Sequence, residues 1–309
     1  MNRRDFRVSR SRSAIPLRDF VFLVRPLLLL AVATAAMLSM TPVHAAETGY
    51  APVNGLQLYY EIHGPAKATT TPLVLLHGGG DTIETSFGAL LPVLARTRRV
   101  IALEQQGYGH TADVPDRPFT FEQSADDTAA LLAHLGIARA DLLGFSNGGT
   151  IALQVAIRHP QCVRKLVLVS TLTFRHGADP ALWEWMKNAR LENMPVELQD
   201  AYRKVAPQPE NLRLMHDKAA QRMRDFRDIP SDALRAITAP ALVIVGDTDV
   251  IRPEHALELA RLLPHAQLAV LPATDHMAIM HRTELLEPML TRFLNADLSR
   301  GTGVPPVGK

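Results

Sequence analysis

Cysteine is almost absent from this chain, which has one such residue, Cys162, among 309. A single thiol cannot form an internal disulfide, so the fold must depend on its core alone. Cys162 follows Pro160 after a helix-like run and has no partner residue at a typical spacing, which favours a packed or idle thiol over a catalytic one. No grouping of cysteine and histidine has metal-ligand spacing, and we predict neither a metal nor a cofactor.

Long apolar runs are lacking except for one near the N-terminus. Seven arginines precede this run, which follows Pro26, and small residues lead up to Ala45. This order predicts a secretory signal peptide at residues 1–45 that is cleaved after Ala45, and therefore a periplasmic or secreted protein. The alternative is an uncleaved membrane anchor, but about 15 apolar residues fall short of the roughly 20 that span a bilayer. Arg3-Arg4 resembles the start of a twin-arginine signal, which leaves the export route open.

An excess of charge of one sign is also lacking. The whole chain carries a formal charge of +2, and residues 1–45 hold seven arginines against two aspartates, so residues 46–309 carry −3. The basic isoelectric point therefore belongs to the targeting segment. No basic stripe is left in the mature chain, and we expect no nucleic-acid partner and no stable membrane insertion after cleavage.

Short apolar runs alternate with helical patterns along residues 46–297. Thr120-Phe121-Glu122-Gln123 has the spacing of a capping box and begins one of the helical patterns. Such alternation predicts an α/β fold with a mostly parallel central sheet and helices on both faces. Strands are expected at residues 56–62, 73–76, 100–103, 141–145, 166–169, 241–245 and 268–271, and helices at 87–96, 121–135, 148–159, 253–263 and 285–294.

One segment breaks the alternation. Residues 172–238 contain no convincing strand, hold both tryptophans, and carry helical fragments separated by prolines. A bare loop of this length is improbable in a compact domain, so we predict an inserted helical cap at about 172–238. The last residues, 298–309, are polar and rich in glycine and proline, which predicts a disordered tail.

The segment Gly144-Phe145-Ser146-Asn147-Gly148 satisfies the pattern G-x-S-x-G. A predicted strand lies directly before it and a predicted helix directly after it, which is the context of a sharp turn that exposes a nucleophilic serine. The alternative is a turn whose glycines serve only packing. A serine hydroxyl is a poor nucleophile until a base takes its proton, so the first interpretation requires a histidine and a carboxylate elsewhere.

Two aspartates follow the predicted strand at 241–245, and either could orient the histidine. We favour Asp249, because Asp247 directly after Gly246 suits a turn in which its side chain caps backbone amides. Both lie at the end of a strand, where α/β sheets place their sites.

The predicted base is His276, because it is the histidine in a loop at a strand's C-terminal end. His281 is expected on or beside the final helix, and His255 and His265 are the other histidines that follow the acid in the sequence. The order Ser146, Asp249, His276 then falls on three strand ends.

Oxyanion donors are expected from the segment His77-Gly78-Gly79-Gly80, which follows the predicted strand at 73–76. A glycine-rich turn leaves backbone amides free to face a developing negative charge. The amide of Asn147, first in the helix after the serine, is the second expected donor. His77 itself is expected to be structural.

These segments together resemble the α/β-hydrolase fold superfamily across residues 50–297. The resemblance rests on HGGG at 77–80, GFSNGG at 144–149, G-x-x-D at 246–249 and D-H at 275–276, in the order that the family has them.

The resemblance implies a catalytic triad of Ser146, Asp249 and His276. It also implies an oxyanion hole made of the backbone amides of Gly79 and Asn147. Gln106 departs from the family, since many members carry an arginine at this position, and any ion pair that the arginine makes must be absent.

The combined interpretation is a serine hydrolase that cleaves a small-molecule carboxylic ester or lactone through an acyl-enzyme intermediate. Dehalogenases and epoxide hydrolases of this fold use an aspartate as nucleophile, and Ser146 argues against both. Hydrolysis of a carbon–carbon bond or an amide, cofactor-free perhydrolysis, and a catalytically silent binding protein are the alternatives. The sequence does not predict an oligomeric state.

Overall fold

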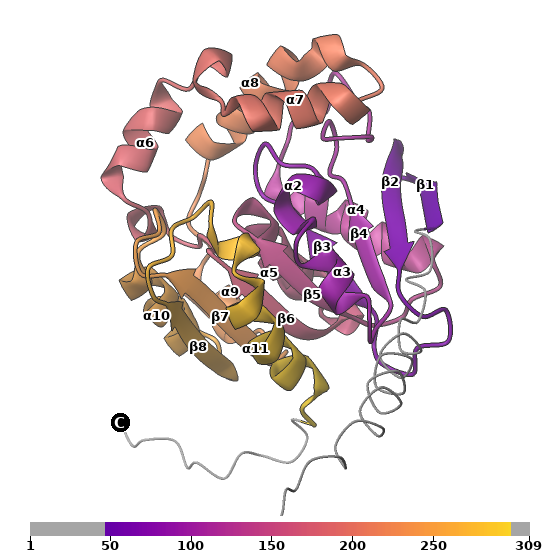
Figure 1. Cartoon of the computed structure of the whole chain (residues 1–309). Coiled ribbons are helices and arrows are strands. Elements are labelled where there is room, and N and C mark those ends of the chain that lie inside the picture. Colours follow the sequence, from indigo (N-terminus) through magenta and orange to yellow (C-terminus); the bar gives the residue numbers. More distant parts are fainter. Residues whose placement is uncertain (1–46, 298–309) are drawn as a thin grey trace, which may run out of the picture. The chain divides into compact units, whose positions relative to one another are not determined.

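The computed structural model describes residues 47–297 of the chain (Figure 1). The secretory signal predicted at residues 1–45 and the tail predicted at 298–309 lie outside the described residues. Short, continuous apolar runs form most of the strands, as buried parallel strands require. The strands are β1 (Glu47–Val53), β2 (Leu56–His63), β3 (Leu73–Leu76), β4 (Val100–Leu103), β5 (Ala140–Phe145), β6 (Val163–Val169), β7 (Ala241–Gly246) and β8 (Ala266–Leu271).

These eight strands form one sheet in the order β1-β2-β4-β3-β5-β6-β7-β8. Neighbours from β4 to β8 pair in parallel, whereas β2 pairs antiparallel with both β1 and β4. The predicted fold class is therefore confirmed. The sequence analysis did not predict strand β1, because Gly49 and Pro52 interrupt its pattern. An edge strand tolerates proline, since one side of its backbone needs no ladder hydrogen bonds.

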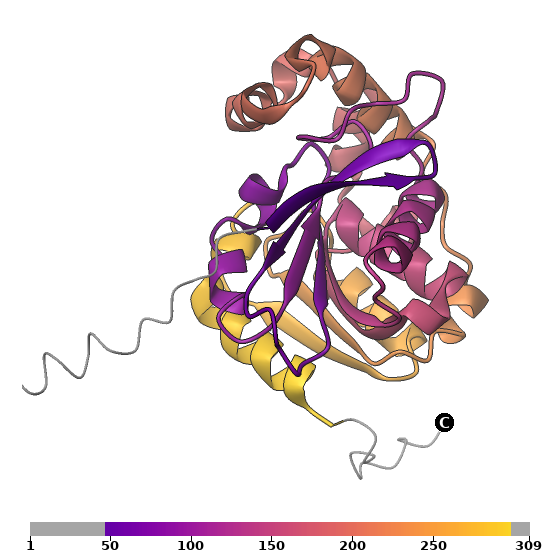
Figure 2. The same ribbon diagram turned by 90° about the vertical axis from the view of Figure 1, so that its right-hand side faces the viewer.

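Helices cover both faces of this sheet (Figure 2). Within residues 47–297, no helix is both long enough and apolar enough to cross a membrane. The helices are α2 (Ile83–Phe87), α3 (Leu91–Leu94), α4 (Phe121–His134), α5 (Asn147–Arg158), α6 (Pro180–Lys187), α7 (Val196–Val205), α8 (Leu212–Arg224), α9 (Ser231–Arg235), α10 (Pro253–Leu262) and α11 (Thr283–Asn295).

Two hydrophobic cores lie on the two faces of the sheet. Strand β6 shows the division, because Leu166 and Leu168 belong to the core with α4, α5 and α10, while Val167 belongs to the core with α2, α3 and α11. Side chains alternate between faces along a strand, so a strand covered on both faces must be apolar throughout.

The helix predicted at residues 87–96 is wrong in its extent. The structure has two short helices here, α2 and α3, separated around Gly88. Helix α2 begins earlier than predicted because the side chain of Thr82 accepts a hydrogen bond from the amide of Thr85, 3.3 Å away. Pro92 then stands in the first turn of α3, where its missing amide proton costs no helical hydrogen bond.

The cap prediction is confirmed, since residues 172–238 hold helices α6 to α9 and no strand. Helices α6, α7 and α8 lie beyond the carboxyl ends of the parallel strands (Figure 1). Trp183 on α6 stabilises the connection to the core. Its indole N–H donates to the carbonyl of Arg175 at 2.8 Å, and the guanidinium of Arg175 lies 4.0 Å from the centre of its ring.

Gly148→Ala tests how closely α5 packs on the sheet. A Cβ atom at this position would overlap the backbone carbonyl of Leu76 in β3, which cannot turn away as a side chain could. We expect the variant to lose about 2 kcal/mol or more of unfolding free energy in urea denaturation. The control is Gly136→Ala, where a Cβ meets open space at a φ of +65° and only backbone strain of about 1 kcal/mol is expected. Equal losses in the two variants would contradict the close packing.

Candidate active site

Ser146 stands in a sharp turn between β5 and α5. Its φ is +53° and its ψ is −118°, a backbone conformation that a residue with a side chain rarely adopts. The amide of Ser146 donates to the carbonyl of Val169 in β6 at 2.8 Å, which ties the turn to the neighbouring strand. A Cβ at Gly144 would overlap the backbone of Gly148, so the glycines of the motif are needed for the turn to close.

The structure brings Ser146, His276 and Asp249 into one hydrogen-bonded chain. The Nε2 atom of His276 lies 3.0 Å from Ser146 Oγ, and its Nδ1 atom lies 2.7 Å from Asp249 Oδ1. A carboxylate accepts only, so Nδ1 carries the proton and Nε2 offers its lone pair to the serine hydroxyl. This is the geometry in which a histidine can take the proton of an attacking serine.

The carboxylate of Asp249 is buried, yet it is held in its charged form. Burial by itself would raise its pKa, but hydrogen bonds from His276, Ser170 and the amide of Ile251 outweigh burial and leave the pKa below its usual value. Ser170 donates to Oδ2 at 2.5 Å, and Ile251 donates to Oδ1 at 2.9 Å. The charge of Asp249 therefore persists at neutral pH and can stabilise a protonated His276.

Sequence reasoning missed Ser170, which positions the acid. Ser170 directly follows β6, so it lies at the same edge of the sheet as Ser146 and Asp249. Its φ is +52°, outside the strand conformation, and its hydroxyl hydrogen-bonds to the carboxylate of Asp249. A polar residue at the carboxyl end of a parallel strand was the available signal.

Asp247 has the turn role expected for it. Its carboxylate accepts from the amides of Ala273 and Thr274, both at 3.0 Å. These hydrogen bonds, that of Thr274 first, lower the pKa of the exposed Asp247. The side chain thus holds the loop that leads into His276, while Asp249 contacts the imidazole itself.

The other C-terminal histidines lie away from the serine. His281 is the exposed last residue of a 3-10 turn before α11, and His265 is exposed between α10 and β8. His255 is buried on α10. None of the three hydrogen-bonds to Ser146 or Asp249 among the described residues, in contrast to His276.

The two expected oxyanion donors lie at the same cavity. Asn147 is the first residue of α5, so its amide has no partner within the helix. Gly79 lies in the loop after β3, and the side chain of Asn147 occupies the place where a Cβ of Gly79 would be. Both residues line the cavity under the cap. The two residues thus lie next to each other, and their role as an oxyanion hole stays a prediction.

The glycine-rich loop is held in place by buried polar groups. The amide of Gly78 donates to Ser86 Oγ at 3.1 Å, and Ser86 Oγ donates to Asp81 Oδ2 at 2.9 Å. His77 is structural, as expected, because its Nδ1 donates to the carbonyl of Gly78 at 2.8 Å and its Nε2 accepts from the amide of Gln105 at 3.0 Å. Burial lowers the pKa of His77, so its imidazole stays neutral.

A cavity of about 100 Å³ lies between this loop, Asn147 and the cap helices. Its walls are mainly apolar, with Trp185 and Met186 from α6, Leu198 from α7, and Met215 and Met223 from α8. The remaining lining residues are Gly79, Gly80, Asn147, Ala189, Met194, Pro195, His216, Ala219 and Ala220.

Gln106, which departs from the family pattern, binds the same groups as a lysine of the cap. Gln106 Nε2 donates to Asp113 Oδ1 at 2.8 Å and to the carbonyl of Arg117 at 2.9 Å. Lys218 on α8 donates to Asp113 Oδ2 at 2.6 Å and to the same carbonyl of Arg117 at 3.1 Å. Gln106 and Lys218 thus share their acceptors, and the ion pair of Lys218 with Asp113 ties the cap to the core.

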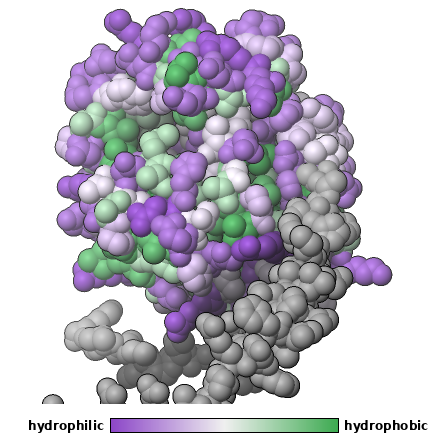
Figure 3. All heavy atoms as spheres, in the orientation of Figure 1, coloured by the Kyte–Doolittle hydropathy of each residue, from purple (hydrophilic) through white to green (hydrophobic). Residues whose placement is uncertain are grey.

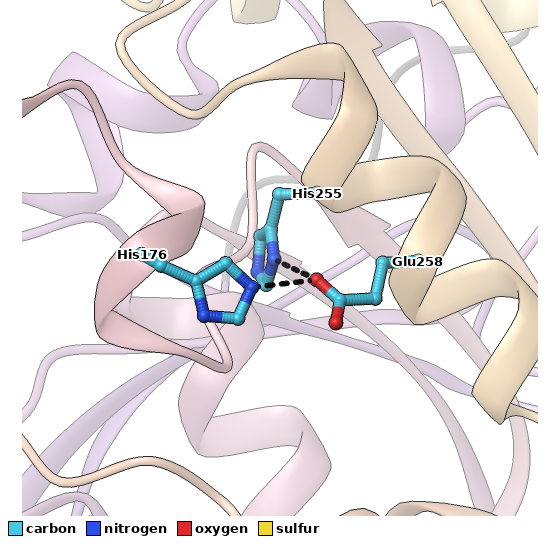
Figure 4. Close-up of side chains that lie close together, drawn as sticks. All are labelled: His176, His255 and Glu258. Atoms are coloured by element: carbon cyan, nitrogen blue, oxygen red, sulfur yellow. Dashed lines mark hydrogen bonds and ion pairs between the residues drawn. The ribbon is translucent and has the colours of Figure 1, made fainter.

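Three side chains away from the triad lie close enough to hold one metal ion. The nitrogen and oxygen atoms of His176, His255 and Glu258 lie within 4.8 Å of one another. Figure 4 shows both rings directed at the carboxylate, with distances of 2.9 Å from His176 Nε2 and 3.5 Å from His255 Nδ1. The amide of Thr173 donates to His255 Nε2 at 3.0 Å, which leaves the ring proton on Nδ1. A proton there suits a hydrogen bond to Glu258 and would have to move before a metal could bind.

The fold and the site place this chain in a known family. A family model described as alpha/beta hydrolase fold matches residues 71–228. The chain is 31% identical over 245 residues to 2-hydroxymuconate semialdehyde hydrolase of Pseudomonas sp. strain CF600, covering 72% of this chain and 86% of that protein. The chain therefore belongs to the α/β-hydrolase family.

Solved structures show the same fold. The 2-hydroxy-6-oxo-6-phenylhexa-2,4-dienoate hydrolase of Rhodococcus sp. strain RHA1 superposes with a TM-score of 0.70 at 23% identity, covering 82% of this chain and 100% of that chain. The enol-lactonase of Burkholderia xenovorans LB400 has a TM-score of 0.64 at 25% identity, covering 80% of this chain and 100% of that chain. These relatives are hydrolases, and so is the protein described here.

Asp249→Asn and Asp247→Asn distinguish the two aspartates. Asparagine at 249 cannot hold the same tautomer of His276, so we expect covalent labelling of Ser146 by a fluorophosphonate to slow about 1,000-fold or more. Asparagine at 247 keeps one acceptor oxygen for the loop amides and should slow labelling by no more than about tenfold. Stopped-flow labelling rates measure both effects, and a larger loss at 247 would refute the assignment of Asp249.

Proposed function

We propose that the protein is a serine hydrolase that cleaves carboxylic esters or lactones with an apolar, uncharged acyl group. The observation that carries this proposal is the hydrogen-bonded chain from Asp249 through His276 to Ser146. Asn147, which directly follows Ser146, lines the apolar cavity. A serine so placed is activated by the neighbouring base when it attacks a carbonyl.

The residues supply each step of acyl transfer. Ser146 Oγ attacks the carbonyl carbon while His276 Nε2 takes its proton, and Asp249 stabilises the imidazolium that forms. The amides of Gly79 and Asn147 face the negative charge on the carbonyl oxygen. His276 then returns the proton to the leaving alcohol, and water hydrolyses the acyl-enzyme by the same steps.

The lining of the cavity supports an uncharged acyl group. Among the described residues, neither an arginine nor a lysine lines it, and His216 is the one titratable side chain on its wall. A substrate with a carboxylate would lose its hydration there without gaining a cationic partner. The chemistry of the Rhodococcus relative, which is named for a dienoate, is therefore less well matched to this cavity than ester hydrolysis.

Lactone hydrolysis is the second candidate. The enol-lactonase of Burkholderia xenovorans has the same fold at 25% identity. A lactone is a cyclic ester, and its ester group is uncharged. The triad and the donors needed are the same for both substrates, so only the shape of the cavity discriminates between them.

Covalent labelling tests whether Ser146 is the nucleophile. The purified protein should react with a fluorophosphonate, and Ser146→Ala should not react. His276→Ala should abolish ester turnover, since within residues 47–297 no other base hydrogen-bonds to Ser146. His281→Ala is the matched control and should keep most of the turnover, because the side chain of His281 is exposed and makes no hydrogen bond to Ser146 among the described residues. Labelling is measured by intact-protein mass spectrometry and turnover by release of p-nitrophenol.

Two outcomes would contradict different parts of this proposal. A folded wild-type protein that resists labelling would indicate a silent binding protein. Loss of turnover in the His281 variant with retention in the His276 variant would overturn the choice of base.

A series of p-nitrophenyl esters tests the substrate class. Each added methylene buried against the methionines of the cavity contributes about 0.8 kcal/mol, so kcat/KM should rise about threefold to fourfold per methylene from acetate to butyrate. The p-nitrophenyl half-ester of succinate has a similar length but carries a carboxylate, and we expect it to fall at least about tenfold below butyrate. An equal or better rate for the half-ester would contradict the uncharged acyl group. Lactones of matching size belong in the same assay.

A further inference from the structure

A second cavity lies under the cap, on the opposite side of α8 from the catalytic cavity. It has a volume of about 350 Å³ and is bounded by α8, by the first turn of α4 and by α5. Lys218 and Arg222 of α8 line this cavity, whereas Met215 and Met223 of the same helix line the catalytic one. The spacing of these residues places the two pairs on different faces of α8.

Arg222 is a buried cation without a carboxylate partner among the described residues. Its side chain is 5% exposed, and its Nη2 donates to the hydroxyl of Tyr108 at 3.1 Å. Its Nε is buried and hydrogen-bonds to no described group. The guanidinium carbon lies 4.9 Å from the ring centre of Phe121, a cation–π contact that compensates for only part of its lost hydration. A buried charge of this kind favours the binding of an anion.

The other charged groups at this cavity do not neutralise Arg222. Lys218 is paired with Asp113 at 2.6 Å and so contributes little net charge. Glu122, Asp225 and Arg227 line the rim and are exposed, where water screens them.

The first turn of α4 adds to the positive potential of the cavity. Thr120 caps this helix of 14 residues, and Phe121 and Glu122 of its first turn line the cavity. Helix N-termini favour negative charge nearby. The walls beside this charged floor are aromatic, with Phe119, Phe121 and Phe226.

We propose that this cavity is a second binding site, which takes a small monocarboxylate with an aromatic or branched apolar body. The carboxylate accepts from the guanidinium of Arg222, and Gln154 of α5, which also lines the cavity, carries a side-chain amide. The apolar body packs against the phenylalanines. This site is separate from the proposed chemistry at Ser146 and does not depend on it, although an acid released by ester hydrolysis belongs to the class that it binds.

Calorimetric titration of the purified full chain with phenylacetate tests the proposal. Phenylacetamide, which has the same shape without the charge, is expected to bind at least tenfold more weakly. Arg222→Met keeps the length of the side chain and should weaken phenylacetate binding at least tenfold, while Arg224→Met, an exposed position on the same helix, should change it less than twofold. No binding at concentrations up to about 10 mM, or equal binding by Arg222→Met, would overturn the proposal.

Two further measurements keep the outcome clear. Titration with phenylacetate after fluorophosphonate treatment should give the same affinity, because Ser146 is not among the residues that line this cavity. If the protein does not label, the proposed serine hydrolase is refuted, but the titration still tests the second binding site. Wild-type crystals soaked with 4-bromophenylacetate should show an anomalous bromine peak between α8 and α4. This experiment uses the wild-type protein, so it does not depend on whether a variant folds. A bromine peak in the catalytic cavity alone would overturn the second site.

Discussion

The turn between β5 and α5 is the constraint on which the rest of the site depends. Ser146 adopts a φ of +53°, and such a turn closes only because Gly144 and Gly148 allow the backbones of strand and helix to meet. The same turn puts the amide of Asn147 at the free N-terminal end of α5. One local conformation therefore places both the proposed nucleophile and a proposed oxyanion donor, and a Cβ at either glycine would overlap the neighbouring backbone.

The acid and the base reach Ser146 because parallel strands end at one edge of the sheet. Val169 at the end of β6 pairs with Ile244 in β7, and Gly246 at the end of β7 pairs with Leu271 in β8, so the residues that follow these strands emerge at the same edge of the sheet. Asp249 keeps its charge in a buried place through three hydrogen-bond donors, and Asp247 holds the loop that carries His276. The geometry of these three residues thus depends on hydrogen bonds from neighbours outside the group.

Helix α8 gives the cap two different surfaces. Its methionine face closes the catalytic cavity, and its basic face reaches the core, where Lys218 binds Asp113 beside Gln106. On the face drawn in Figure 3, hydrophobic residues are scattered among hydrophilic ones over cap and core alike, so that face has no single apolar surface to compete with the enclosed cavities.

The sequence by itself determined the fold class, most strands, the cap and the three residues of the triad, because apolar runs, glycine spacing and strand ends are local features. It favoured Asp249 over Asp247 by turn chemistry, and the hydrogen bonds agree. Only the tertiary structure decided the roles of Ser170, Lys218 and Arg222. Their partners lie between 79 and 114 positions away along the chain, and no local pattern encodes which distant group a polar side chain will meet once the core has packed.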